Sequence, residues 1–118
     1  ESMGSVYHCG DVGMGMVAKL ANNAVGIGAS ALLIEVRTMA NAYGMDLPTL
    51  MEIIRNGTGN CFAAQNWDAV VPTWPHLAQL MKKDMNLCRD AGKQVDVGLP
   101  MIETWLETDW ISMKPEDL

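Results

Sequence analysis

The longest apolar stretch of the chain runs from Val12 to Ala42, where Ala, Val, Leu, Ile and Met dominate and proline is absent. A helix over this range has about 30 residues and is about 45 Å long at 1.5 Å per residue. It is apolar almost all round as far as Ile34, which predicts a buried central helix. Tyr43-Gly44 predicts its end, because glycine readily takes the left-handed conformation that follows a helix.

The rest of the pattern predicts shorter elements. These are a helix opened by Pro48 with Asp46 as its N-cap and closed by Gly57, a short helix over 61–67, an extended connection over 71–75, a helix over about 76–94, and a helix that begins near Pro100 and ends before Pro115. No alternating strand pattern of useful length occurs. The sequence therefore predicts an all-α domain with one long central helix. Its small residues, Gly26, Gly28, Ala29 and Ser30, form a thin waist that another helix, including one from a second subunit, can approach closely.

Size and charge exclude several classes of protein. A length of 118 residues with 49% hydrophobic side chains suits one domain with a real core. The net charge of −6 with eight basic residues argues against a nucleic-acid partner, which needs clustered Lys and Arg. The most apolar window, Ala24 to Ile34, is shorter than the roughly 20 residues that span a bilayer, so no membrane partner is expected.

The three cysteines, Cys9, Cys61 and Cys88, are odd in number and widely spaced. They match no zinc spacing, so no metal site is expected, and a reduced cytoplasmic compartment is the simpler interpretation. A redox-active cysteine protein would need a thiolate of low pKa, and no basic cluster clearly supplies one.

Lys19 is an ammonium group inside an otherwise apolar stretch, and Asn23 follows one turn later on the same face, with Asn22 beside it. Burial of an ammonium lowers its pKa, which suits a lysine that exchanges a proton. The alternative from the pattern alone is a lysine that reaches solvent near the start of the helix.

Asp84 lies four residues from both Leu80 and Cys88, so its carboxylate projects near an apolar face. The pattern alone favours a structural ion pair or a hydrogen bond to a neighbouring helix over a functional role.

The segment Gly13-Met14-Gly15-Met16-Val17-Ala18 formally fits the dinucleotide fingerprint G-x-G-x-x-G/A, and Glu35 follows at a suitable distance. That fingerprint requires a strand before the glycines and a second strand that ends at the acidic residue. Residues 15–35 are predicted as one unbroken helix, so we reject this segment as a nucleotide site.

Two longer motifs carry a family resemblance. The run Gly10-x-x-Gly13-x-Gly15-x-x-x-Lys19-x-x-Asn22-Asn23 resembles the catalytic signature of the β-hydroxyacid dehydrogenases, which are related to 6-phosphogluconate dehydrogenase. Leu80-Met81-Lys82-Lys83-Asp84-Met85-Asn86-Leu87 is similar to the L-x-x-K-D-x-x-L segment of that family. The resemblance covers about residues 8–110 and implies the all-α fold of the 6-phosphogluconate dehydrogenase C-terminal domain. The family includes 3-hydroxyisobutyrate dehydrogenases and tartronate semialdehyde and glyoxylate/succinic semialdehyde reductases.

The resemblance also implies roles for individual residues. Lys19 corresponds to the general acid/base, Asn23 and Asn22 to substrate-binding amides, and Lys83 to a lysine that reaches the cofactor, with Asp84 as its neighbour or a hinge residue. The cofactor is NAD or NADP, bound mainly by an N-terminal Rossmann domain, and the substrate is a small hydroxyacid or aldehyde-acid.

The same resemblance implies a homodimer through residues 26–30, since the long helix of the family packs across its subunit interface. Residues 1–5 are expected to be a cloning remnant or an inter-domain linker, and residues 6–118 the helical domain. This chain alone is expected to be inactive without its Rossmann half. The alternative is a non-catalytic helical oligomerisation module derived from the same family.

Overall fold

The long helix α1 spans Val12–Ala42, as the apolar pattern predicts, and Gly44 follows it with φ of +81°. The structure is a computed structural model that describes residues 12–118. The expectations for residues 1–5, Cys9 and Gly10 lie outside the described residues. Over the described range the chain is helical without a strand, so the predicted all-α fold is confirmed. The segment 13–18 lies inside α1, which confirms that it is not a Rossmann loop.

The shorter helices follow α1 in the predicted order. They are α2 Leu47–Arg55, α3 Phe62–Gln65, α4 Trp67–Val70, the 3-10 turn η1 Val71–Thr73, α5 Trp74–Gln94, α6 Pro100–Glu107 and the 3-10 turn η2 Pro115–Asp117. The predicted cap of α2 is confirmed, because the Asp46 carboxylate accepts from the Thr49 backbone N–H at 3.2 Å. The predicted extended connection over 71–75 is wrong, because these residues are helical. Both prolines there occupy first-turn positions, where a helix does not need the missing N–H.

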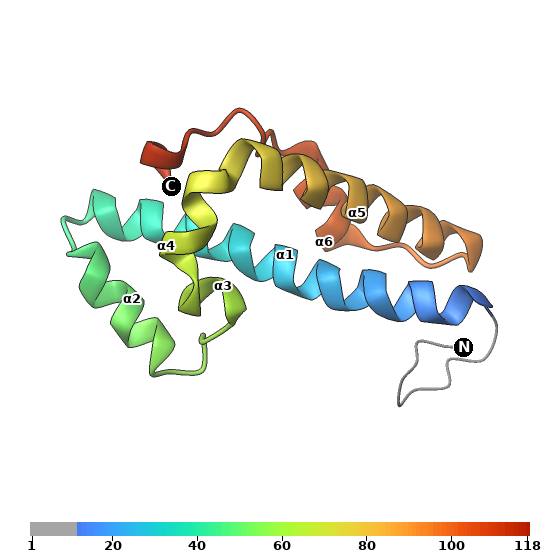
Figure 1. Cartoon of the computed structure of the whole chain (residues 1–118), viewed down its shortest axis with the longest axis horizontal. Helices are drawn as coiled ribbons and strands as arrows, with labels where there is room; N and C mark the ends of the chain where they lie inside the picture. Colours follow the sequence, from blue (N-terminus) through green and yellow to red (C-terminus); the bar gives the residue numbers. More distant parts are fainter. Residues whose placement is uncertain (1–11) are drawn as a thin grey trace.

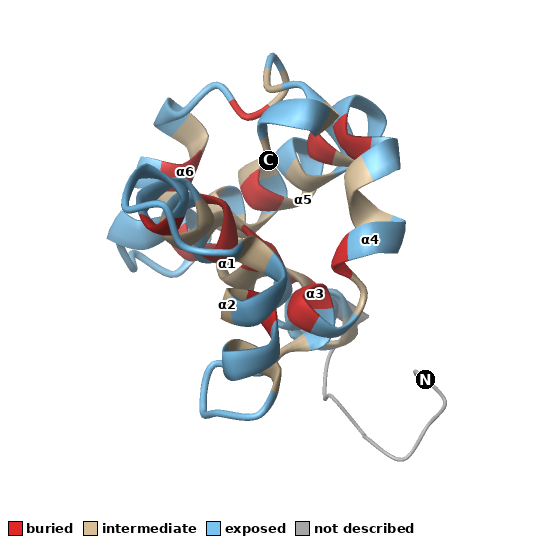
Figure 2. Cartoon of the chain, turned by 90° about the vertical axis from the view of Figure 1, so that its left-hand side faces the viewer, coloured by how far each residue is buried: buried red, intermediate tan, exposed pale blue. Residues whose placement is uncertain are grey.

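Figure 1 shows α1 and α5 lying side by side and running in opposite directions, with α6 beside them and α2 folded back from the end of α1. α1 packs against α2, α3, α5 and α6 and determines the longest dimension of the molecule, which measures 50 × 30 × 23 Å. The core gathers around the second half of α1, where Ile27, Leu33 and Ile34 are buried (Figure 2).

The four tryptophans dominate the core. Trp67, Trp74, Trp105 and Trp110 are all at most 6% exposed. The indole of Trp74 donates to the Trp110 carbonyl at 2.7 Å, and that of Trp110 donates to the Trp105 carbonyl at 2.8 Å. The rings of Trp105 and Trp110 stack with centroids 5.8 Å apart. The indole N–H groups of Trp74 and Trp110 are therefore both hydrogen-bonded, as burial requires.

Arg37 ties the C-terminal segment to α1. Its guanidinium lies 5.0 Å from the centroid of the Trp67 ring and donates to the Leu118 backbone oxygen at 3.2 Å. Burial lowers the pKa of Arg37, against the attraction of Asp68, and the nearby Arg55 lowers it further.

The expectation that α1 is buried all round is wrong within this chain. Val25, Leu32 and Met39 are between 56% and 75% exposed, and they recur every seven residues along one side of the helix. By length and composition, α1 could also cross a bilayer, since its segment 13–42 includes a window with a mean hydropathy of 1.4 that is 28% buried. The expectation that no stretch is long enough was therefore wrong, although the core helix of a soluble protein meets the same two criteria.

Candidate functional site

Lys19 lies near the N-terminal end of α1, and its side chain is exposed. Met16 and Val17 beside it are also about half exposed, and Leu20 is the first buried residue along the described part of the helix. Lys19 makes no hydrogen bond or ion pair with another described residue. The expectation of an ammonium buried in apolar surroundings is therefore wrong for this chain by itself. The structure shows the alternative, in which the lysine reaches solvent because the start of α1 extends past the core.

Asn23 and Asp84 are brought together across α1 and α5. The Asn23 side-chain Nδ2 donates to Oδ2 of Asp84 at 3.1 Å, and both residues are partly buried. Asp84 thus makes the hydrogen bond to a neighbouring helix that the pattern alone favoured. The two bonded residues are 61 residues apart in the sequence, so the bond joins the two sequence motifs into one surface.

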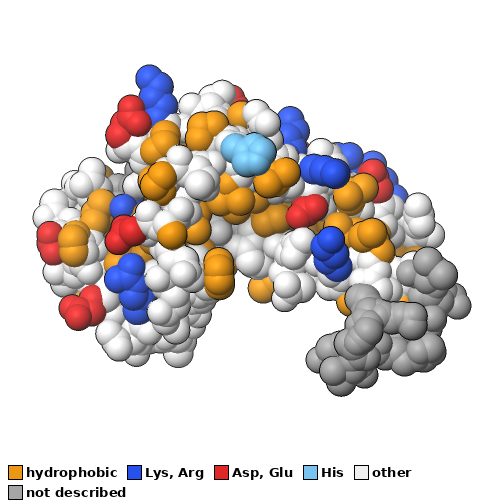
Figure 3. All heavy atoms as spheres, viewed as in Figure 1, with side chains coloured by type: hydrophobic (Ala, Val, Ile, Leu, Met, Phe, Trp, Pro, Cys, Tyr) orange, Lys and Arg blue, Asp and Glu red, His pale blue; other side chains and the backbone are white. Residues whose placement is uncertain are grey.

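The face of α5 around Asp84 is open. Leu80 and Leu87 are 48% and 43% exposed, and Lys83 between them is exposed as well. Residues 80, 83, 84 and 87 share one side of a helix, because they follow the i, i+3, i+4, i+7 spacing. The apolar side chain of Leu80 therefore lies on an exposed side of this helix. Figure 3 shows charged side chains lying among hydrophobic ones along the band between α1 and α5.

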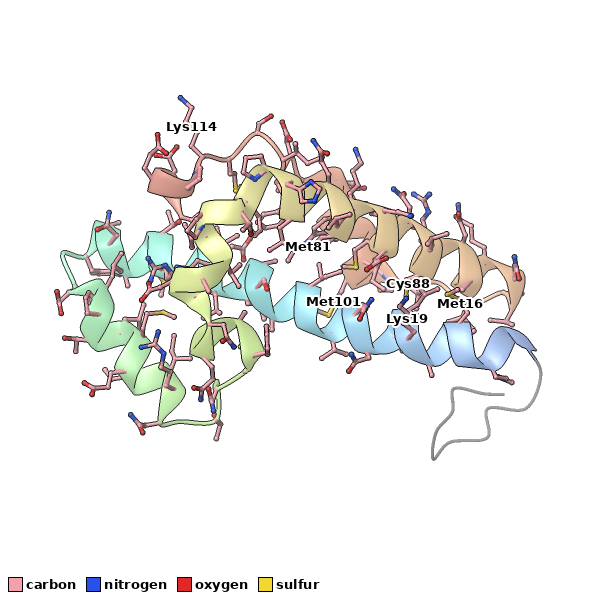
Figure 4. All side chains as sticks on the ribbon, viewed as in Figure 1. Met16, Lys19, Met81, Cys88, Met101 and Lys114 are labelled. Carbon is pink, nitrogen blue, oxygen red and sulfur yellow. The ribbon has the colours of Figure 1, made fainter. Side chains whose placement is uncertain are left out.

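Cys88 is a site neighbour that sequence reasoning missed. The two helices are antiparallel, so one turn back from Asn23 on α1 corresponds to one turn forward from Asp84 on α5. This register places Lys19 opposite Cys88, and Figure 4 shows both side chains between the two ribbons. Cys88 is a partly buried free thiol, as is Cys61. The pairing of Asn23 with Asp84 was the missing signal, since neither motif alone gives the register.

The substrate-side residues lie together only in part. Asn22 and Asn23 are three and four residues after Lys19, so all three lie on one side of α1. Asn22 is exposed, and among the three only Asn23 has a hydrogen bond to a described residue of α5. Lys83 can contact a nucleotide from the open face of α5. The described residues offer no strand followed by a glycine loop, so they fit a peripheral contact with NAD(P) and do not form its phosphate cradle. Nor do they contain a cluster of three or more metal-ligating side chains.

An apolar hollow lies on the side of α1 away from Lys19, between this helix and α6. It has a volume of about 700 Å³ and an almost wholly apolar lining. Its lining includes Ala24, Val25, Gly28 and Leu32 of α1 and Met101 and Trp105 of α6. A Cβ added at Gly26 or Gly28 would meet nothing within 4 Å, so the predicted thin waist is not filled from within the described chain.

Comparison with known proteins identifies the family. The family described as "NAD-binding of NADP-dependent 3-hydroxyisobutyrate dehydrogenase" matches residues 13–108, which include Lys19, Asn23 and the open face of α5. The chain belongs to this family. The 3-hydroxyisobutyrate dehydrogenase family consists of oxidoreductases, so the predicted resemblance is confirmed.

Curated relatives agree with this family. The chain is 33% identical over 99 residues to a probable 3-hydroxyisobutyrate dehydrogenase of Mycobacterium bovis, a match that covers 75% of this chain and 34% of that protein. It is 32% identical over 115 residues to a probable mitochondrial 3-hydroxyisobutyrate dehydrogenase of Dictyostelium discoideum, covering 86% of this chain and 35% of the relative.

A third relative is named for a different substrate. The NAD-dependent L-serine dehydrogenase of Pseudomonas aeruginosa is 31% identical over 116 residues, covering 86% of this chain and 38% of the relative. The chain thus spans about a third of the length of the 3-hydroxyisobutyrate dehydrogenase relatives that it matches. No solved structure matches the chain.

Proposed function

We propose that this chain is the C-terminal helical part of an NAD(P)-dependent dehydrogenase of small 3-hydroxyacids, and that it supplies Lys19 as the general acid/base. The observation that carries the proposal is the hydrogen bond between Asn23 and Asp84, because it unites the two family motifs on one open surface. 3-Hydroxyisobutyrate, tartronate semialdehyde, and glyoxylate or succinic semialdehyde are the candidate substrates. L-Serine joins them through the name of the Pseudomonas relative.

Each residue of the surface has a distinct task in this proposal. Lys19 accepts the proton of the substrate hydroxyl during oxidation and returns it during reduction. When bound, NAD or NADP accepts or supplies the hydride. Asn23 and Asn22 hydrogen-bond the substrate next to Lys19. Lys83 contacts the cofactor from the open face of α5, with Asp84 beside it.

The exposure of Lys19 is consistent with this role if a second domain covers it. Exposed apolar side chains flank the polar residues, namely Met16, Leu80 and Leu87. Such a surface suits a protein contact, because burial of apolar area stabilises association. A nucleotide-binding half that covers this face also excludes water from the surroundings of Lys19.

The experiment joins residues 1–118 to the N-terminal two thirds of a 3-hydroxyisobutyrate dehydrogenase and measures turnover. We expect Lys19→Ala to lower kcat by roughly 10²- to 10⁴-fold, the usual contribution of a positioned acid/base. Lys114→Ala is the matched control, since Figure 4 shows this lysine far from Lys19. Equal turnover of the Lys19→Ala protein and the unsubstituted one would show that the assignment is wrong.

The isolated chain should be inactive and should bind NAD(P)H only weakly. The described residues lack a phosphate cradle, and most of the affinity for a dinucleotide comes from that element. Calorimetric titration of NADH and of NADPH into the chain measures this directly. Submicromolar binding of either would contradict the proposal that the N-terminal half provides most of the affinity for the dinucleotide.

A second copy of the chain is the proposed occupant of the hollow between α1 and α6. Val25, Leu32 and Met39 are exposed at seven-residue intervals, the repeat with which two helices pack along a common seam. Within the predicted contact, Gly28 borders the hollow while Ser30 is 4% exposed and faces the core of its own chain. Light scattering should show a dimer that Gly28→Leu weakens. A monomer at all concentrations would contradict this proposal.

The same hollow favours the second candidate function, a non-catalytic oligomerisation module. That module needs the seam of α1 but has no use for Lys19. The two candidates therefore differ in the turnover experiment, where only the dehydrogenase predicts a large effect of Lys19→Ala.

A further inference from the structure

The bond between Asn23 and Asp84 is distinctive among the hydrogen bonds of the described residues, because it alone joins two helices through side chains at both ends. It is partly buried and lies one turn from Lys19 on α1. Lys83 precedes Asp84 but is exposed and makes no hydrogen bond with a described residue. The Asp84 carboxylate is thus engaged within the domain, whereas the ammonium of its neighbour remains available to a ligand.

The chemistry of the two groups sets the direction of the bond. A carboxylate offers acceptors only, whereas an asparagine amide has a carbonyl at one end and an NH₂ group at the other. A terminal amide can turn over between two orientations, and its partners decide which one is adopted. Facing Asp84, the Asn23 amide must present Nδ2 to α5. Its carbonyl Oδ1 then accepts no hydrogen bond from another described residue, and Asn23 lies on the side of α1 that carries Lys19.

We propose that Asp84 is a positioning residue that fixes the orientation of the Asn23 amide and thereby decides which hydrogen-bonding atom the site offers. In this arrangement Oδ1 accepts from a donor, which can be the Lys19 ammonium or a substrate hydroxyl. The second N–H of Nδ2 remains for an acceptor. Asp84 therefore acts through Asn23 and does not itself bind the cofactor. The identity of the donors rests on the function proposed above, whereas the fixed orientation of the amide does not.

The first test reads the amide itself in the 118-residue chain and needs no activity. In NMR spectra of ¹⁵N-labelled protein, we expect one Nδ2 proton of Asn23 to be shifted downfield and protected from exchange with solvent. Asp84→Ala should remove this shift and accelerate exchange roughly tenfold, the effect of losing one charge-assisted hydrogen bond. Asp90→Ala is the matched control, because Asp90 is an exposed carboxylate on the same helix that contacts its sequence neighbour Arg89. An Asn23 amide that is unchanged by Asp84→Ala overturns the proposal.

The second test is a double-substitution cycle on the chain joined to a nucleotide-binding half. Asp84→Ala should lower kcat about tenfold and leave the KM for the cofactor within about twofold, because a misoriented group impairs chemistry more than binding. Added to Asn23→Ala, it should change kcat by less than about twofold, since its effect passes through that amide. Asp84→Asn, which keeps the side-chain shape but can donate as well as accept, should give an intermediate kcat. It also replaces Asp84→Ala in this cycle if that variant does not fold.

A direct role of Asp84 at the cofactor predicts a different pattern. In that case Asp84→Ala raises the KM for NAD(P)H by the same factor with or without Asn23→Ala, and this result would overturn the proposal. The function proposed above fails separately, by undiminished turnover of the Lys19→Ala protein. The NMR result on the isolated chain keeps its meaning in that event, so the two failures can be told apart.

Discussion

The two ends of α1 differ in how completely the side chains there are buried or hydrogen-bonded within this chain. At the tryptophan end, formed by Trp67, Trp74, Trp105 and Trp110, each ring is buried. At the lysine end, formed by Lys19, Asn23, Lys83 and Asp84, one hydrogen bond between side chains crosses the two helices, and both lysines are exposed. The tryptophan end is thus a finished core, although Trp105 and Trp110 also border the apolar hollow between α1 and α6. The lysine end is a surface with polar groups surrounded by exposed apolar ones.

This difference indicates where stability and function reside in the domain. A core gains its free energy from apolar burial, so residues at the tryptophan end should determine folding. Exposed residues contribute little to folding, so the motifs at the lysine end need another explanation. A covering domain supplies one, and the match of the chain to about a third of its 3-hydroxyisobutyrate dehydrogenase relatives is consistent with such a domain.

The largest expected effect is the loss of a tryptophan from the finished core. Trp74 is 1% exposed, and its indole N–H is bonded to the Trp110 carbonyl. Trp74→Ala should lower the free energy of unfolding by about 3–5 kcal/mol, from lost burial and the cavity left behind. Urea denaturation followed by circular dichroism measures this. Phe62→Ala, at an aromatic residue that is 77% exposed, should change stability by less than about 0.5 kcal/mol. Similar losses of stability in both variants would contradict the assignment of Trp74 to the core.

Alanine substitutions at two helical glycines should change the free energy of unfolding by smaller amounts and in opposite directions. A Cβ at Gly92 of α5 would lie 2.9 Å from the Val97 carbonyl oxygen and 2.9 Å from Leu99 Cδ1, whereas one at Gly28 meets open space. Gly92→Ala should therefore destabilise the domain by about 1–3 kcal/mol through overpacking against backbone. Gly28→Ala should stabilise the monomer by about 0.5–1 kcal/mol, because alanine loses less conformational entropy in a helix. Thermal unfolding at low protein concentration checks both signs, and a stabilising Gly92→Ala would contradict the packing described here.

The smallest expected effect concerns pH. Hydrogen bonds from Ser112, first from its side chain and then from its backbone N–H, hold the pKa of Asp109 below the usual value for aspartate. A carboxyl group whose pKa is lowered by folding stabilises the fold at pH values above its unfolded pKa. That contribution is lost as the pH falls through the folded pKa. An NMR titration of the Asp109 carboxyl carbon should give a lower midpoint in the folded chain than in urea. An equal or higher midpoint in the folded chain would contradict the bonding around Ser112.

Helix positions were predictable because they depend on local signals. Proline-free apolar residues gave the bounds of α1, Asp46 gave a cap, and Gly44 gave the end of a helix. The connection over 71–75 was mispredicted because its two prolines look like helix breakers in the sequence. A proline breaks a helix in its interior, but it is well accommodated in the first turn. Burial was harder, since hydrophobicity alone does not distinguish a side chain that meets its own core from one left for a partner. Val25 and Leu32 of α1 illustrate this limit.

The candidate site was predictable in its residues but not in its geometry. The motifs named Lys19, Asn23 and Asp84. The bond between the last two, which are 61 residues apart in the sequence, depends on the antiparallel register of α1 and α5. No local pattern specifies that register. The same gap hid Cys88, which faces Lys19 only once α5 lies against α1. The pattern left the exposure of Lys19 open, because it does not show that the apolar residues around Lys19 are themselves largely exposed.

The proposed function requires that a nucleotide-binding half covers the lysine end. The most direct measurement compares rates of lysine acetylation, read by mass spectrometry, in the isolated chain and in the chain joined to that half. If that half covers the lysine end, Lys19 reacts readily in the isolated chain and becomes protected in the joined protein, while Lys114 reacts equally in both. Equal reactivity of Lys19 in both proteins, with the joined protein folded and binding NAD(P)H, would contradict the account.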